Sequence, residues 1–75
     1  MTSFTSLDLI LSALENASKT KVPLIITHVD WSFPEPKVVD TKTQVDKLRS
    51  NFVQLDLEGP YMILDLADIV EVQLI

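Results

Sequence analysis

The side chains best suited to chemistry gather near the end of the chain, in the stretch ILDLADIVEVQLI. Asp65, Asp68 and Glu71 follow one another at three-residue spacing, and three carboxylates at one corner are a ligand set for a divalent cation. Asp also caps tight corners by accepting hydrogen bonds from nearby backbone N–H groups. Alternation places Glu71 on the solvent side of the final strand. We therefore interpret the acids as structural and predict no metal and no other cofactor.

The only histidine, His28, offers acid–base chemistry near neutral pH. In an extended chain Leu24 and Ile26 fall on the same side as the imidazole, which favours a structural or rim position. Gly59 is the only glycine, so glycine-rich phosphate loops and glycine-flanked serine elbows are excluded. The absence of cysteine excludes thiolate nucleophiles, disulfides and thiol-ligated metals. We predict that the protein is not an enzyme.

Length and charge limit the remaining classes of protein. A chain of 75 residues is one domain, 1–75, near the lower size at which an apolar core alone stabilises a fold. Eleven acids against six bases give a net charge of −5, which disfavours nucleic acid as a partner. The N-terminal apolar segment lacks a preceding basic region, and no apolar run approaches the roughly 18 residues of a membrane span. These features predict a soluble cytoplasmic protein without a membrane segment.

Hydrophobic periodicity divides the chain into one helix and five strands. Apolar residues recur at helical spacing over about residues 6–18, and Thr5 followed by Asp8 approximates a capping box. Alternation and β-branched residues predict the strands, and the polar stretch DKLRSN and the pair Gly59–Pro60 predict turns. The expected strands cover about residues 22–31, 38–45, 51–58, 61–66 and 69–74.

A helix, a strand, a long connection and three strands joined by tight turns is the element order of an Sm-like or SH3-type small barrel. Within residues 39–75, Val45 and Asp46 stand where a family pattern has an I-D pair, and ILDLADIVEV supplies its closing strands. In these features the chain resembles the YolD-like family of Gram-positive bacteria and their phages. The resemblance implies an α+β fold with an N-terminal helix and a five-stranded, mainly antiparallel Sm-like or SH3-type barrel. It also implies a phage- or mobile-element-related protein.

The least ordinary local feature is HVDWSFPEPK, in which Trp31 and Phe33 flank the turn into a loop that Pro34 stiffens. Large aromatic residues on a rigid exposed loop lose little entropy on binding and are typical anchors at protein interfaces. The alternative interpretation is that Trp31 folds back and closes one open end of the barrel. The loop is therefore our first candidate for protein binding, with its aromatic residue either in the core or at an interface.

The final strand is the second candidate surface. If Val70, Val72 and Leu74 face the core, Ile69 and Ile75 must face the opposite side. An edge strand with outward isoleucines invites pairing with another strand. We therefore hypothesise a homodimer or a small ring formed through this edge.

These observations predict a small non-catalytic interaction or regulatory module that binds a host or viral protein. The alternative is a nucleic-acid-associated Sm-like regulator or DNA-repair accessory protein. That alternative requires the basic residues Lys37, Lys42, Lys47 and Arg49 to cluster on one side. Alternation places Lys37 and Lys47 at opposite ends of one strand, which weakens it.

Overall fold

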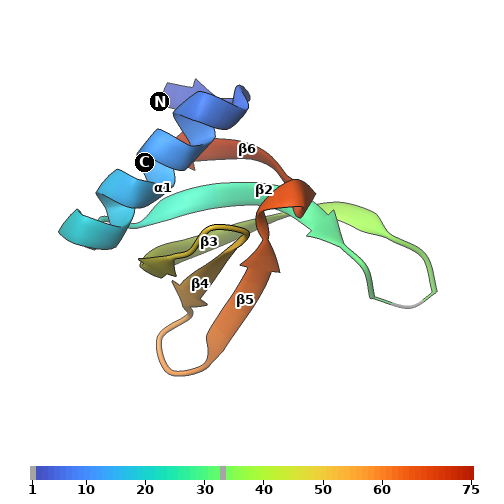
Figure 1. Cartoon of the computed structure of the whole chain (residues 1–75). Coiled ribbons are helices and arrows are strands. Elements are labelled where there is room, and N and C mark those ends of the chain that lie inside the picture. The colour runs from blue at the N-terminus through green and yellow to red at the C-terminus, as the bar shows by residue number, and fades with distance from the viewer. Residues whose placement is uncertain (1, 33) are drawn as a thin grey trace.

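The computed structural model describes residues 2–32 and 34–75, and within them one α-helix packs on an antiparallel sheet (Figure 1). The predicted α+β class, with an N-terminal helix followed by antiparallel strands, is confirmed. The elements in chain order are β1 (Thr2–Phe4), α1 (Leu7–Thr20), β2 (Leu24–Asp30), β3 (Lys37–Leu48), β4 (Phe52–Asp56), β5 (Tyr61–Asp65), the 3-10 turn η1 (Leu66–Asp68) and β6 (Ile69–Leu74).

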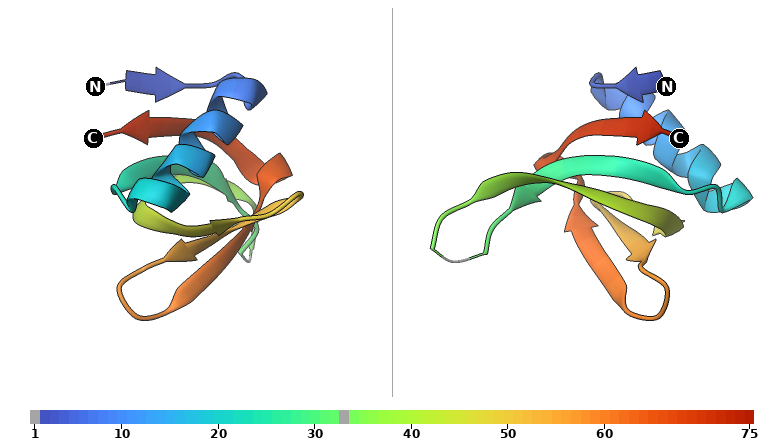
Figure 2. Two further views of the ribbon diagram at one scale, coloured as in Figure 1. Left: turned by 60° about the vertical axis from the view of Figure 1, so that its left-hand side comes forward. Right: turned by 180° about the vertical axis from the view of Figure 1, so that it is seen from behind.

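The six strands form one open sheet in the order β1-β6-β2-β3-β4-β5. The first half of β3, residues 37–43, pairs with β2, and residues 44–48 pair with β4. Because β3 changes partner midway, β4 and β5 turn away from the other strands, as Figure 2 shows from two sides. The terminal strands β1 and β5 do not pair with each other. The expected closed barrel of five strands is thus replaced by a bent six-stranded sheet.

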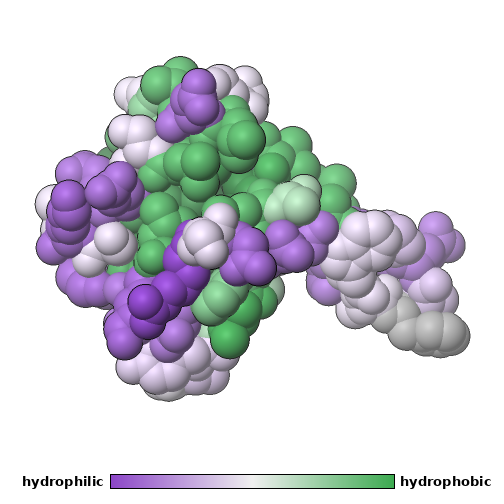
Figure 3. All heavy atoms as spheres, viewed as in Figure 1, coloured by the Kyte–Doolittle hydropathy of each residue, from purple (hydrophilic) through white to green (hydrophobic). Residues whose placement is uncertain are grey.

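The core lies between α1 and the bent sheet. Ile10, Leu14 and Ala17 share one face of the helix because they are four and three residues apart. They pack on buried residues of the strands, and each fully buried aliphatic side chain contributes roughly 1.5–3 kcal/mol through loss of apolar surface from water. Figure 3 shows apolar residues also on the surface over α1 and the strands beside it. The strand residues of the core are Leu24, Ile26, Val45, Val53, Leu55, Leu64 and Val72.

The two ends of α1 are capped differently. Its N-cap is Ser6, which makes no side-chain cap hydrogen bond, so the capping box expected from Thr5 and Asp8 is not formed. At the other end Lys21 adopts a left-handed conformation, with φ of 59°, and its backbone N–H donates to the Ala17 carbonyl. The helix therefore runs two residues beyond the predicted end.

β2, β4 and β5 lie within their predicted ranges and are shorter by one to three residues, whereas β1 and the end of β3 are strand segments that the sequence does not predict. β1 was not predicted, because three residues are too few to display a period of two. β3 continues through Asp46–Leu48, which belongs to the polar stretch expected to form a turn. The register of β3 with β4 shifts between Val45 and Lys47, so Asp46 is a bulge residue that restarts the alternation. Because of the bulge, the polar residues Asp46 and Lys47 remain within β3, and pairing with β4 continues to Leu48.

Candidate protein-binding surface

Trp31 directly follows β2 and is 67% exposed, so it is not part of the core. Asp30, the last residue of β2, accepts a hydrogen bond from the Ser32 N–H at 3.1 Å and thereby closes a tight turn around the indole. Pro34 is exposed as well, and Phe33 lies outside the described residues. In Figure 1 the ends of β2 and β3 extend beyond the rest of the sheet. The structure thus places Trp31 on an extension of the fold, with its ring available for contact.

A hollow of about 440 Å³ opens beside Trp31. Phe52 at the start of β4 and Ile63 in β5 line it together with the indole, and His28 and Asp65 also contribute. Trp31 and Ile63 are 32 residues apart in sequence, yet they line the same hollow. The lining is mixed, because Asp30, Asn51 and Asp68 also contribute, and a hollow of this kind with an exposed aromatic residue at its border is suited to receive a side chain of another protein.

β5 continues the same surface. Tyr61 and Ile63 are 61% and 66% exposed, whereas Leu64 is buried and Met62 packs on the core. The strand pairs with β4 on one side and is the last strand of the sheet. Sequence analysis predicted a strand here, but it assigned no role to Tyr61 or Ile63. The alternation in YMILD was visible in the sequence, but the position of the strand at an edge was not.

His28 is a structural residue of the core. Its side chain is 1% exposed and lies on the predicted face with Leu24 and Ile26. The imidazole Nε2 is 2.8 Å from Thr41 Oγ1 on the neighbouring strand, and Nδ1 is 3.4 Å from the Val29 carbonyl oxygen. A buried polar ring that is held by such contacts stabilises one register of β2 against β3.

The acids near the last corner act on the backbone. Asp65 Oδ1 accepts a hydrogen bond from the Ala67 N–H at 3.0 Å and caps η1. Asp56, which ends β4, caps the following turn in the same way through the Glu58 N–H. Within residues 2–32 and 34–75, no three His, Asp or Glu side chains are close enough to hold a metal ion. The capping role predicted for Asp65 is therefore confirmed.

Ile69 and Ile75 do not form the outward edge that the sequence predicted. The pairing of β2 with β6 shifts its register between Thr27 and His28, so that Thr27 faces Glu71 and His28 faces Ile69. This bulge turns Ile69 toward the core, and Val70 is 46% exposed instead. β6 is also not an unpaired edge, because β1 pairs with its residues 72–74.

Ile75 is exposed but lies at the other end of the sheet from Trp31. The register places Leu74 opposite Leu24 at the start of β2, whereas Trp31 follows the end of that strand. Ile75 lines a separate groove of about 510 Å³ with Leu9 of α1 and Val22. Among the predicted binding residues that the structure describes, Trp31 borders the hollow at β5 and Ile75 lies at the opposite end of the sheet.

Two of the basic residues that the nucleic-acid alternative requires lie far apart along β3. Lys37 begins β3 and Lys47 lies near its end, as predicted. The Lys21 amine donates hydrogen bonds to the backbone carbonyl oxygens of Val45 and Asp46 in β3. Lys19 forms an exposed ion pair with Glu15 at 3.5 Å. Of the four basic residues that the nucleic-acid alternative requires to cluster, Lys37 and Lys47 thus lie at opposite ends of one strand.

The chain matches no protein-family model, no curated protein and no solved structure. Among the described residues, no helix is both long and apolar enough to cross a membrane.

Proposed function

We propose that this chain is a small non-catalytic protein-interaction module that binds another protein with Trp31 and the hollow beside it. The observation that carries the proposal is the 67% exposure of Trp31 next to a hollow lined by Phe52 and Ile63. Exposure of a tryptophan costs free energy in water, and its burial by a partner recovers that free energy. The turn closed by Asp30 and Ser32 reduces the entropy lost when the indole is immobilised.

The proposed architecture is an opened variant of the Sm-like or SH3-type barrel. Support comes from the order β6-β2-β3-β4-β5 after an N-terminal helix, with the short 3-10 turn η1 between β5 and β6. The resemblance of residues 39–75 to the YolD-like family agrees with this arrangement. We propose on the same basis a phage- or mobile-element-related protein whose partner is a host or viral protein.

The proposal is tested by affinity capture from a lysate of the source cells with three forms of the chain. We expect the wild type to retain a partner that Trp31→Ala loses. Val38→Ala is the matched control, because Val38 is an exposed apolar residue near the start of β3. Capture of the same proteins by wild type and Trp31→Ala would contradict the proposal.

Trp31 also provides a direct spectroscopic measurement, because it is the only tryptophan. When the captured partner is purified and titrated into the chain, the emission of Trp31 should shift to shorter wavelength as the indole leaves water. An unchanged spectrum during saturable binding would place the partner elsewhere on the surface.

A further inference from the structure

β5 differs from the other free edges of the sheet in lacking the features that prevent edge-to-edge association. β1 is only three residues long, and the first half of β3 carries the exposed charges Asp40 and Lys42. The part of β6 not covered by β1 is interrupted by the bulge at Val70. Short length, charge and bulges are the usual means by which proteins protect sheet edges. β5 has five regularly paired residues, and its outward side chains are uncharged until Asp65.

The hydrogen-bond pattern of the β4–β5 hairpin shows which backbone groups are free. The Leu57 N–H donates to the Pro60 carbonyl at 3.0 Å, and the Leu66 N–H donates to the Asn51 carbonyl at 3.1 Å. Hydrogen-bonded pairs alternate with non-bonded pairs along an antiparallel ladder, so Met62 and Leu64 bond to β4. The N–H and C=O groups of Tyr61 and Ile63 and the N–H of Asp65 therefore point to the open edge, whereas the Asp65 C=O, at the N-cap of η1, accepts the first hydrogen bond of that turn.

We propose that β5 pairs with β5 of a second copy of this chain, antiparallel and about a two-fold axis at Ile63. This register opposes Ile63 to Ile63 of the second copy and Tyr61 to Asp65 of the second copy. In this register Ile63 forms a hydrogen-bonded pair with Ile63 of the second copy, and the free N–H of each Asp65 lies opposite the C=O of Tyr61 of the other copy. A two-fold contact uses the same surface on both copies, as closed dimers require.

The side chains agree with this register. Ile63 and Tyr61 lie on one face of β5 and cover each other's apolar surface across the new strand pair. Each Asp65 faces a tyrosine, so no acid opposes another acid even though the chain carries a net charge of −5. This dimer needs no Trp31 partner for its formation, but it covers Ile63, which also lines the hollow beside Trp31. The self-association that the sequence predicts at β6 is thus proposed instead at β5, on the opposite edge of the sheet.

The first experiment measures the molar mass of the purified chain against concentration by light scattering or sedimentation. Two five-residue strands make a small contact by comparison with stable interfaces of about 1,200–2,000 Å², so we expect a dissociation constant on the order of 100 µM. The mass should rise from 8.4 kDa toward twice that value. A mass that stays monomeric to about 1 mM would overturn the proposal, as would growth beyond a dimer.

Two variants with the same change of charge locate the interface. Ile63→Lys places two ammonium groups opposite each other and should weaken the dimer by about tenfold or more. Val70→Lys alters an exposed residue of β6 and should leave the dissociation constant unchanged. Dissociation by Val70→Lys but not by Ile63→Lys would assign the interface to β6 and overturn the proposal.

Amide hydrogen exchange followed by NMR gives a readout that needs no variant. Exchange at Tyr61, Ile63 and Asp65 should slow as protein concentration rises, whereas Met62 and Leu64 should be protected at all concentrations. Unchanged exchange of the first three amides in a sample that is dimeric by mass would exclude β5. Because the protein partner of Trp31 is absent from these measurements, the dimer and the proposed function fail or succeed separately.

Discussion

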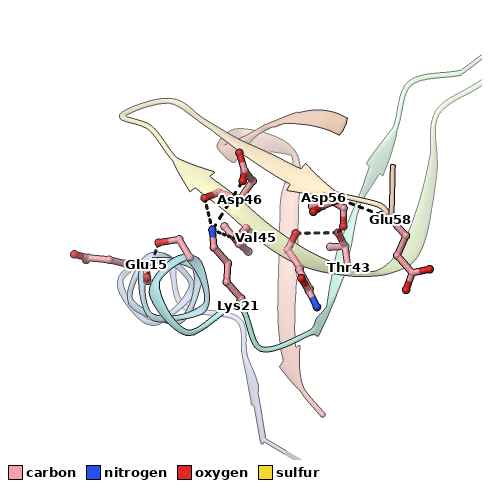
Figure 4. Close-up of polar contacts among 9 residues, drawn as sticks. Glu15, Lys21, Thr43, Val45, Asp46, Asp56 and Glu58 are labelled. Carbon is pink, nitrogen blue, oxygen red and sulfur yellow. Dashed lines mark hydrogen bonds and ion pairs between the residues drawn. The ribbon is translucent and has the colours of Figure 1, made fainter. Parts of the chain in front are cut away.

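The ammonium group of Lys21 lies 2.8 Å from the carbonyl oxygen of Asp46, and thereby joins the end of α1 to the bulge of β3 (Figure 4). The same amine is 3.3 Å from the Val45 carbonyl oxygen. A bulge removes a residue from the regular strand ladder, and its carbonyl then needs another donor. Lys21 provides that donor although its positive φ would favour glycine. The side chain thus explains why a lysine occupies this helix end.

Substitution of Lys21 tests this contact. Lys21→Met should lower the free energy of unfolding in urea by about 1 kcal/mol, because half-exposed charge-assisted hydrogen bonds are lost. Lys21→Gly should lose less stability than Lys21→Met, because glycine relieves the left-handed backbone. Lys19→Met is the control, since exposed i,i+4 ion pairs contribute only about 0.3–0.5 kcal/mol. Equal losses in Lys19→Met and Lys21→Met would refute the role of the bulge contact.

The buried contact between His28 and Thr41 predicts a measurable coupling. His28→Leu and Thr41→Val should each destabilise the fold by about 1–3 kcal/mol, because each leaves the other polar group buried without its partner. The double variant should lose less than the sum, with a coupling of about 1 kcal/mol in a double-mutant cycle. Additive losses would mean that the two side chains are independent. Thr27→Val, which removes an exposed bond to Asp40, serves as the comparison.

The β6 bulge predicts opposite behaviour for two adjacent residues. Ile69→Ala should destabilise the protein by about 1–3 kcal/mol, since it removes methyl groups packed on the core. Val70→Ala should change stability by less than about 0.5 kcal/mol because the side chain is largely exposed. Thermal and urea unfolding of both variants are the measurement. A larger loss for Val70→Ala than for Ile69→Ala would mean that β6 has no bulge and that Val70, not Ile69, faces the core.

The negative net charge and the separation of Lys37 from Lys47 predict weak or absent binding to nucleic acid. In a gel-shift assay at low salt, we expect no retardation of single- or double-stranded DNA or RNA at micromolar protein. Lys37 and Lys47 lie at opposite ends of β3, and the net charge of −5 repels phosphate. Retardation that falls steeply with added salt would instead support the nucleic-acid-associated role.

Local patterns in the sequence were sufficient for the helix and for most strands. The spacing of Ile10, Leu14 and Ala17 and the alternation of Val53 and Leu55 are set by backbone periods, which neighbouring residues display directly. The predicted bounds of β6 agree with the structure, and so does the shared face of His28 with Ile26. These features depend on contacts that recur every two to four residues.

The tertiary structure alone decided which strand is the edge and which side chains face outward. Pairing of β1 with β6 joins residues about 70 positions apart, and no local pattern in TSF signals it. The bulges at Asp46 and Val70 reverse the alternation, because one extra residue moves the following side chains to the other face. The exposure of Trp31 and the free edge of β5 follow from these long-range pairings. For that reason the candidate surface became visible only in the folded chain.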